Sequence, residues 1–408
     1  MTIPLLACNH RPIKGIKMAK ILLLTLSLVL TSCFEKDEPL DGVWSLKLRI
    51  QNKEIPFQLH FQENQKVDLH NGAEVINLGY DLLNDIVLIP ILNFDALLEL
   101  KQDGSTITGN WIKPNREPEF RVPVTGTKVP AKIKVPKLGI PEKWKIELSD
   151  KDKTKEGILL FTQRDDYTFA SVLTRTGDYR FLTPKKSGDS LVLYGFDGVF
   201  SFFFDGKLSG EIYEGTMYSG ISSQKSFKAK VNPDFELPDP TKTTTLAGNL
   251  SDVYLKKLNG KTESLINESN KDKVKVFQVF GSWCPNCIDE TRFIKKWRER
   301  NKDKDVSFSI IAFERSPNKK EAIKQLKKTK KMLAIDYPIY IGGLTSGTKV
   351  EEVLPQLKNF ISFPTTLILD KNNRVRKIHA GFSGPATGKY YEDFMMEFDS
   401  TIDRLLKE

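Results

Sequence analysis

Two cysteines, Cys284 and Cys287, are separated by two residues and lie where an apolar run changes into a helical pattern. Residues 275–280 read as a buried strand, and residues 286–300 place apolar side chains at helical spacing. A Cys-x-x-Cys pair that opens a helix puts its first sulfur beside free backbone N–H groups and the positive end of the helix dipole, which stabilise a thiolate. The second thiol lies one turn further on and can resolve a mixed disulfide. The pair therefore predicts thiol–disulfide exchange.

Cysteine usage supports chemistry over structural cross-linking. The chain has four cysteines, and the other two, Cys8 and Cys33, lie in its N-terminal segment. A bridge between Cys284 and Cys287 closes a very short loop and contributes little stability. The alternative, half of a zinc site, needs two further Cys or His ligands, and His379 stands alone nearby. We expect no metal and no cofactor besides the redox-active Cys284–Cys287 disulfide.

The N-terminal segment has the pattern of a signal peptide. Residues 21–30 form an apolar run of ten that follows four basic residues; the run is too short to span a bilayer but suits a signal-peptide core. It ends in Leu30-Thr31-Ser32-Cys33, which resembles the bacterial lipobox, where the cysteine is lipidated and the chain is cleaved before it. An uncleaved anchor, or a secretory signal with a coincidental cysteine, is the alternative.

These features give the expected N-terminal organisation and location. Residues 1–32 are the expected signal peptide, with translation starting at Met1 or Met18, and residues 33–40 are a polar tether. Lipidation of Cys33 would place the protein in the bacterial cell envelope, anchored to a membrane and facing the periplasm or the cell surface. Removing the four basic signal residues lowers the net charge from +10 to +6, so we expect no nucleic-acid partner.

An internal duplication is expected over residues 41–127 and 142–235, where short alternating runs separated by Asn, Asp and Gly predict an all-β region. We favour two tandem units over one larger sandwich or barrel, joined by an extended connector at 129–141. The pairs that carry the proposed repeat are Trp44 with Trp144, Phe94 to Leu98 with Phe196 to Phe200, Asp103-Gly104 with Asp205-Gly206, Ile107 to Trp111 with Leu208 to Ile212, and Phe120 with Phe227.

The β region carries no recognisable catalytic pattern. His60 and His70 lack a nearby pattern of cysteine or carboxylate ligands that would define a metal site. The aromatic residues Phe200, Phe202, Phe203 and Phe204 are typical of a packed strand core. A binding or spacer module is the functional alternative, and an exposed aromatic stripe would favour it.

The C-terminal region, residues 247–408, follows a proline-rich and threonine-rich linker at 232–245 and shows a mixed α/β pattern. We therefore expect a multidomain chain in which the duplicated all-β region precedes an α/β domain. The lysines between Lys319 and Lys331 predict a solvated helix face. The expected strands are 275–280, 306–313, 365–369 and 375–380, and the expected helices are 286–300, 319–332, 350–360 and 390–406.

The motif from Phe280 to Cys287, followed by Glu290, resembles the TlpA/ResA-like thiol-disulfide oxidoreductases of the thioredoxin superfamily. The resemblance covers about residues 247–408 and includes Ser362 to Asp370, which looks like the cis-proline loop of that fold. It implies a thioredoxin-like fold with a cis Pro364 against the two cysteines. It also implies oxidised client proteins and a membrane thiol-electron donor as partners. The implied neighbours of the cysteines are Trp283, Pro285, Asn286 and Phe363.

One position departs from the thioredoxin pattern. Gln278 stands on the strand where thioredoxins place a buried Asp and many TlpA-like proteins an Asn, so an ionisable proton shuttle is absent there. Glu290, on the helix after the motif, is the candidate substitute for proton transfer to Cys287. The alternative for Glu290 is an exposed or helix-capping carboxylate.

The leading hypothesis is a membrane-anchored reductase of protein disulfides that uses the Cys284/Cys287 dithiol. A disulfide oxidant or isomerase is the enzymatic alternative, because Pro285-Asn286 matches the usual dipeptide neither of the reducing thioredoxins nor of the oxidising DsbA proteins. A peroxiredoxin-type peroxidase is disfavoured because Gly281 replaces the threonine of a Thr-x-x-Cys motif. A surface-lipoprotein binding module with an auxiliary thioredoxin domain is the alternative from another class.

Overall fold

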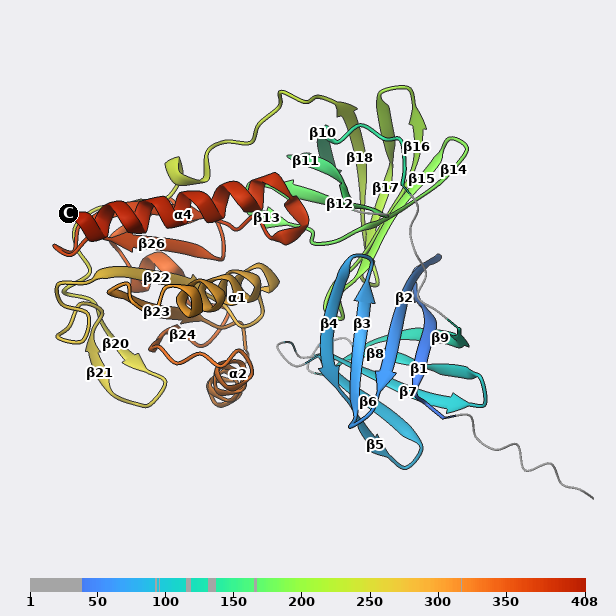
Figure 1. The fold of residues 1–408 in the computed structure, drawn as a ribbon, viewed down its shortest axis with the longest axis horizontal. Helices are drawn as coiled ribbons and strands as arrows, with labels where there is room; N and C mark the ends of the chain where they lie inside the picture. Colours follow the sequence, from blue (N-terminus) through green and yellow to red (C-terminus); the bar gives the residue numbers. More distant parts are fainter. Residues whose placement is uncertain are drawn as a thin grey trace, which may run out of the picture. The chain divides into compact units, whose positions relative to one another are not determined.

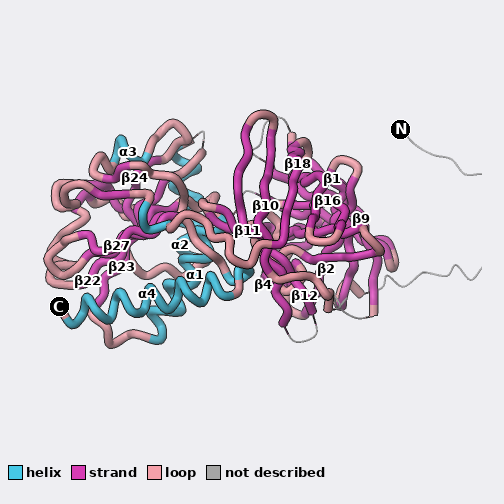
Figure 2. The backbone as a smooth tube through the Cα atoms, turned by 90° about the horizontal axis from the view of Figure 1, so that it is seen from above, coloured by secondary structure: helices cyan, strands magenta, loops and turns pink. Residues whose placement is uncertain are grey.

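The computed structural model describes residues 39–91, 94, 96–114, 119–130, 137–164, 167–316 and 318–408. The expected signal peptide, the lipidation site Cys33 and most of the tether lie outside these residues. Strands make up the regular structure of the described residues up to 231, and helices of four residues or more occur only after residue 284 (Figures 1 and 2). None of the described helices combines the length and apolar character needed to cross a membrane.

The first sheet has nine antiparallel strands in the order β4-β3-β2-β1-β9-β8-β7-β6-β5. Inward side chains alternate with outward ones, as in β1, so that Trp44, Leu46 and Leu48 are buried. The strands are β1 Gly42–Ile50, β2 Lys53–Gln62, β3 Lys66–Asn71, β4 Glu74–Gly79, β5 Asp81–Leu83, β6 Ile86–Ile91, β7 Ala96–Asp103, β8 Thr106–Lys113 and β9 Phe120–Val129.

The second sheet repeats the same topology, with nine strands in the order β13-β12-β11-β10-β18-β17-β16-β15-β14. An isolated bridge between Ala170 and Leu182 links β12 to the segment before β14, so the sheet curls toward a barrel. Its strands are β10 Lys143–Asp150, β11 Lys153–Arg164, β12 Tyr167–Thr174, β13 Gly177–Asp178, β14 Thr183–Ser187, β15 Ser190–Phe196, β16 Ser201–Ser209, β17 Ile212–Ser219 and β18 Ser223–Val231.

The expected duplication of an all-β region is confirmed, and the two tryptophans occupy matching positions. Trp44 pairs with Leu59, and Trp144 pairs with Leu159. Each indole N–H donates to a backbone carbonyl just before its own strand, Leu40 at 2.8 Å and Pro141 at 2.7 Å. The matching tryptophans therefore fix the chain entry into each copy in the same way.

The predicted register of the later strands was wrong. The β7–β8 turn follows Asp103, whereas the β16–β17 turn follows Ser209, so Asp103-Gly104 corresponds to Ser209-Gly210. Asp205-Gly206 lies inside β16 instead of in a turn. There the missing side chain of Gly206 makes room for the Tyr213 ring, so packing and not turn geometry explains this glycine.

The same shift moves the other predicted pairs. Leu48 pairs with Val124 in the first copy, and Leu148 pairs with Phe227 in the second, so Phe227 corresponds to Val124 and not to Phe120. The proposed matches of Phe94 to Leu98 and of Ile107 to Trp111 fall out of register in the same way.

The C-terminal sheet has seven strands in the order β21-β20-β24-β23-β22-β26-β27. β22, β23 and β24 are parallel, β26 pairs antiparallel with β22, and β27 pairs antiparallel with β26. The strands are β20 Tyr254–Lys257, β21 Thr262–Ser264, β22 Val274–Phe280, β23 Val306–Phe313, β24 Ile339–Gly343, β26 Thr365–Leu369 and β27 Val375–Ala380, with a separate pair β19 Thr245–Leu246 and β25 Leu357–Lys358.

Helices cover this sheet because β22 is apolar on both faces. Val274 and Val276 pack with the helices α1 and α4, and Phe277 and Val279 pack on the opposite face with the residues around Leu250. The α-helices are α1 Pro285–Arg300, α2 Lys319–Met332, α3 Val350–Val353 and α4 Lys389–Lys407, and two short 3₁₀ turns, η1 Pro240–Lys242 and η2 Pro385–Thr387, flank the domain.

The helix predicted for residues 350–360 was wrong. Helix α3 ends at Val353, and Leu354 leaves helical geometry because it precedes Pro355. The chain then forms the short strand β25.

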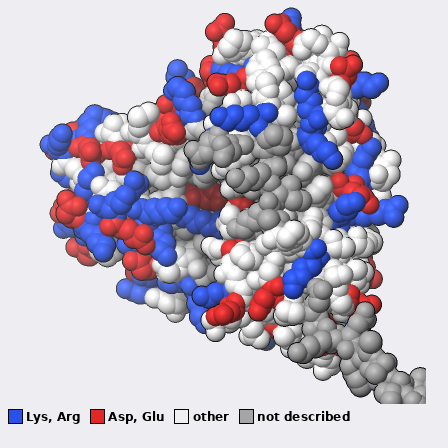
Figure 3. All heavy atoms as spheres, turned by 45° about the vertical axis from the view of Figure 1, so that its right-hand side comes forward, with Lys and Arg blue, Asp and Glu red and all other residues white. Residues whose placement is uncertain are grey.

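Charge on the α2 surface is consistent with the predicted solvated face. Lys320, Lys324, Lys327, Lys328 and Lys331 are exposed, while Leu326 and Ala322 are buried against the sheet. The face of the molecule drawn in Figure 3 intersperses basic and acidic side chains.

Two glycines at matching positions test the duplicated packing. A Cβ at Gly109 would lie 2.0 Å from the Glu99 carbonyl oxygen, and one at Gly215 would lie 2.0 Å from that of Asp205. We expect Gly109→Ala and Gly215→Ala each to lower the free energy of unfolding by about 1–3 kcal/mol. Urea unfolding measures this, with Gly139→Ala as control because no heavy atom lies within 4 Å of its Cβ. Unfolding midpoints equal to the control would contradict the packing account.

Candidate active site

The two motif cysteines lie at the junction of β22 and α1. Cys284 is the N-cap of α1, and its Sγ accepts the backbone N–H of Cys287 at 3.2 Å. Pro285 occupies the first helical position, where its missing N–H costs no hydrogen bond. Cys287 is fully buried and Cys284 is 5% exposed, and both are free thiols. The sequence-based placement of the pair at a helix start therefore agrees with the structure.

The loop before β26 lies against Cys284. The Phe363–Pro364 peptide is cis, as the resemblance implied. The thiol of Cys284 donates to the Phe363 carbonyl oxygen at 3.6 Å, and the Phe363 ring packs edge-on to Trp283 with centroids 5.2 Å apart. These contacts bring Pro364 and Phe363 to the side of the first cysteine, as predicted.

Glu290 is buried beneath the cysteines and is neither exposed nor a helix cap. Its Oε2 accepts the side-chain N–H of Gln278 at 2.7 Å, and its Oε1 accepts the hydroxyl of Thr366 at 2.6 Å. Gln278 also donates to the Cys287 carbonyl oxygen at 3.1 Å. Gln278, the departure from the thioredoxin pattern, thus connects the carboxyl group to the helix turn that carries Cys287.

Burial shifts the proton affinities of this cluster. It raises the pKa of Glu290 to about 7, although the hydrogen bonds from Thr366 and Gln278 oppose the shift. Burial also raises the pKa of the Cys287 thiol well above its usual value, and the nearby Cys284 thiol and Glu290 carboxyl act in the same direction. Glu290 therefore changes charge near neutral pH beside a thiol that resists ionisation.

Polar residues at the end of β23 complete the site, and the sequence reasoning missed them. The guanidinium carbon of Arg315 lies 3.4 Å from the centroid of the Trp283 ring. The Glu314 carboxylate accepts the backbone N–H of Ser282 at 2.9 Å and its hydroxyl at 2.6 Å. Both residues directly follow a parallel strand, and side chains at the carboxyl ends of parallel strands gather at one sheet edge. That rule was the available signal.

The short strand β13 of the second β copy also lies against the motif. Asn286 packs against Gly177 so closely that a Cβ there would come within 1.9 Å of the Asn286 amide nitrogen. The Asp178 carboxylate accepts the backbone N–H of Gly384 at 2.6 Å, in the loop after β27. Burial raises the pKa of Asp178 to about 6. Asn286, one of the two residues between the cysteines, is thus covered by a segment that precedes the thioredoxin-like domain.

Arg180 extends this contact through a buried ion cluster. Its guanidinium pairs with Asp289 at 2.8 Å, with Asp197 at 3.3 Å and with Glu74. Burial lowers the pKa of Arg180, but the three carboxylates outweigh burial, so the net shift is upward. Asp289 belongs to the first turns of α1, so the cluster attaches the cysteine-bearing helix to both β copies. No pattern in the sequence indicated this ion cluster.

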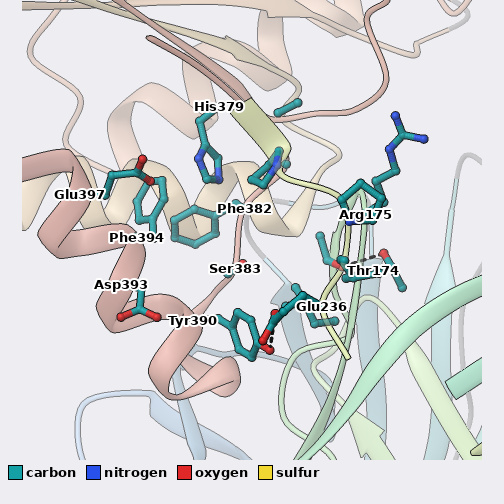
Figure 4. A pocket seen from close by; sticks show the side chains of 17 residues that line it. Thr174, Arg175, Glu236, His379, Phe382, Ser383, Tyr390, Asp393, Phe394 and Glu397 are labelled. Atoms are coloured by element: carbon teal, nitrogen blue, oxygen red, sulfur yellow. Dashed lines mark hydrogen bonds between the residues drawn. The ribbon is translucent and has the colours of Figure 1, made fainter. Parts of the chain in front are cut away.

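A pocket of about 200 Å³ lies beside Gly177 of strand β13. Figure 4 shows Glu236 and Tyr390 close together in this pocket, where the tyrosine hydroxyl donates to the carboxylate at 2.9 Å. His379 also lines the pocket, and burial lowers its pKa to about 4, so the imidazole is neutral at physiological pH. Phe382 and Phe394 make the wall apolar.

Comparison with known proteins places the C-terminal region in a broad class. Residues 229–393 match the Redoxin family model. No curated protein matches the chain. The C-terminal region is therefore a thioredoxin-superfamily domain of the oxidoreductase class.

Solved structures with partial similarity include three bacterial proteins. One is a putative protein disulfide isomerase from Bacteroides thetaiotaomicron, with 18% identity, TM-score 0.30, and coverage of 40% of this chain and 89% of that chain. A DsbF homologue from Corynebacterium diphtheriae has 22% identity, TM-score 0.30, and coverage of 41% and 97%. A putative thiol:disulfide interchange protein DsbE from Chlorobium tepidum has 17% identity, TM-score 0.28, and coverage of 37% and 96%.

Replacement of Glu290 tests its part in proton transfer. Below pH 7 the carboxyl group is protonated and cannot accept the Cys287 proton, so exchange in the native chain should accelerate as pH rises through about 7. Glu290→Gln keeps a similar shape and should remove this rise, slowing exchange at pH 8 by about tenfold or more. Stopped-flow exchange rates from pH 5 to 9 measure the effect, with the exposed Glu299→Gln as control. An unchanged profile in Glu290→Gln would remove Glu290 from the mechanism.

Proposed function

We propose that this chain is a reductase of protein disulfides, held at the bacterial envelope by a lipid on Cys33, with Cys284 and Cys287 as its electron-donating dithiol. The observation that carries the proposal is the buried hydrogen-bonded group of Glu290 and Gln278 beneath Cys287. A structural cysteine pair has no need of a carboxyl group that titrates near neutral pH, and burying one costs stability.

The chemical steps balance with these residues alone. The Cys284 thiolate attacks one sulfur of a client disulfide, which breaks the client bond, forms a mixed disulfide and releases the first client thiolate. Cys287 gives its proton to Glu290 and attacks the Cys284 sulfur. The mixed disulfide then breaks, the second client thiol leaves, and the Cys284–Cys287 disulfide forms. Two electrons pass from the dithiol to the client, and the Glu290 proton passes to the departing thiolate or to water.

The surroundings of Cys287 favour reduction over oxidation of clients. A dithiol becomes a strong reductant when little stabilises its reduced, ionised form, whereas a strong oxidant stabilises that form. Burial disfavours ionisation of Cys287, and the Glu290 carboxylate adds negative charge beside it. Both effects destabilise the ionised dithiol and support a reducing potential.

Pro364 supports recognition of extended client backbone. Its carbonyl oxygen accepts the Gly381 N–H at 2.8 Å, which fixes the loop beside Cys284. Proline has no N–H of its own, so the adjacent backbone groups are left to a client strand. Re-reduction by a membrane thiol-electron donor belongs to the same proposal, because each turnover leaves the pair oxidised.

The β copies favour a supporting role over ligand binding. Phe204 is fully buried in the second core, and Phe202 and Phe203 are partly buried. Phe200 is 38% exposed and stacks on Phe202. Among the described residues of the two β copies, a single exposed aromatic ring does not form the aromatic stripe expected of a polymer-binding surface.

A client-reduction assay tests the proposal. The full chain, reduced and supplied with dithiothreitol, should accelerate the reduction of insulin disulfides. Cys284→Ser should abolish the activity, since the attacking sulfur is lost. Cys287→Ser should instead accumulate a mixed disulfide, because the resolving thiol is missing. An exposed substitution, Glu299→Gln, should leave the rate unchanged. Equal rates with and without Cys284 would refute the proposal.

The anchor is tested separately by the N-terminal peptide of the protein from bacterial membranes. The proposal expects this peptide to begin at Cys33 with a lipid attached. An unmodified terminus, or cleavage at another position, would refute the anchor and leave the redox proposal standing.

A further inference from the structure

The outer surface of the first β copy brings together two histidines and an aspartate. His60 on β2 lies directly opposite Asp68 on β3, and His70 follows two residues later on β3. Side chains two residues apart in a strand share one face, and directly paired residues lie side by side across strands. The intervening residues Leu59 and Leu69 point into the core. The three polar side chains therefore share the outward face.

Distances within this group suit shared coordination of one cation. The available ligand atoms of His60, Asp68 and His70 all lie within 4.8 Å of one another. Zinc binds imidazole nitrogen at about 2.0–2.1 Å and carboxylate oxygen at about 2.0–2.2 Å, so its ligand atoms lie roughly 3.3–3.5 Å apart. The ring centroids of His60 and His70 are 6.5 Å apart, so the two side chains must move closer together to bind one zinc ion.

Two further observations point to a ligand. The Nδ1 atom of His60 is buried and has no hydrogen-bond partner among the described residues. The Asp68 carboxylate is held from both sides, because Gln62 donates to Oδ2 at 2.6 Å and Asn77 donates to Oδ1 at 2.7 Å. Such outer hydrogen bonds orient the carboxylate ligands of metal sites.

The second β copy provides an internal comparison. Because Leu59 and Leu159 pair with Trp44 and Trp144, the ladders place Leu160, Ser171 and Leu173 at the positions of His60, Asp68 and His70. There, Leu160 and Leu173 pack under Phe235, Leu237 and Tyr390. The fold therefore forms without the three polar residues, so their presence in the first copy is not a requirement of the sheet.

We propose that His60, Asp68 and His70 form a site for a divalent transition-metal ion, with Zn²⁺ as the reference ion. Two imidazoles and one carboxylate make a donor set typical of zinc and related ions, and they leave a coordination position open to water or another ligand. The sequence did not reveal this site, because Asp68 joins the histidines only through the β2–β3 register. The proposal is independent of the redox function of the C-terminal domain.

Zinc titration of the full chain tests the site. The starting protein carries Cys284→Ser and Cys287→Ser, because the dithiol binds zinc on its own. Isothermal titration with ZnCl₂ should show one ion bound at His60, Asp68 and His70, and Co²⁺ should give visible d–d absorption there. His60→Gln and Asp68→Asn should each weaken this binding by at least about tenfold.

One control and one further variant separate metal binding from folding. Asp81→Asn, an exposed change in the same sheet, should leave zinc affinity unchanged. Asn77→Ala keeps all three ligands but removes one hydrogen bond to Asp68, so it should weaken binding by about tenfold. Equal affinity in His60→Gln and the starting protein, or saturation only at millimolar zinc, would overturn the proposal.

Discussion

The active site depends on a carboxyl group that is buried under two cysteines. Removing an ionised carboxylate from water costs several kcal/mol unless hydrogen bonds compensate. Here β22 supplies Gln278, β26 supplies Thr366 and α1 supplies Glu290 itself. These hydrogen bonds form only when α1 packs at one position along β22 and β26, and the same packing brings Cys287 and Pro364 to the site. The partial compensation leaves a group with a pKa of about 7, which suits proton exchange with a thiol.

A second buried charge cluster determines what surrounds the site. Arg180 is balanced by carboxylates from three parts of the chain, and one of them, Asp289, is two residues beyond Cys287. Breaking one partner of a buried cluster leaves an uncompensated charge, which is costly. Strand β13, which consists of Gly177 and Asp178, is therefore held against Asn286 and Gly384. This arrangement gives the duplicated β region a direct part in shaping access to the cysteines.

The sequence predicted the position of the two cysteines at a helix start because that position depends on local structure. Cys284, Pro285 and Cys287 lie within one helix turn, and the predicted bounds of the strongly periodic helix α2 agree with the structure. Residues whose role depends on tertiary register were harder to predict. The contacts of Arg315 with Trp283 and of Arg180 with Asp289 join residues that are distant in sequence. His60 lies beside Asp68 only because of the register between β2 and β3.

The errors also have physical causes. Asp205-Gly206 has the composition of a turn, but Gly206 lies inside strand β16, where its missing side chain leaves room for the Tyr213 ring. The predicted helix at 350–360 overlooked Pro355, which ends helical geometry at Leu354. For Glu290, the sequence leaves open a role in proton transfer and an exposed or helix-capping carboxylate, because helical periodicity alone does not show whether a polar side chain is buried.

In the proposed reductase, the Cys284/Cys287 pair donates electrons to disulfides. The reduction potential of the pair in the full chain tests this role directly, measured by equilibration in a redox buffer with the oxidised fraction determined by thiol alkylation and mass spectrometry. The buried Cys287 and the Glu290 carboxylate predict a value close to that of thioredoxin, about −270 mV. A value close to that of DsbA, about −120 mV, would contradict the reductase function.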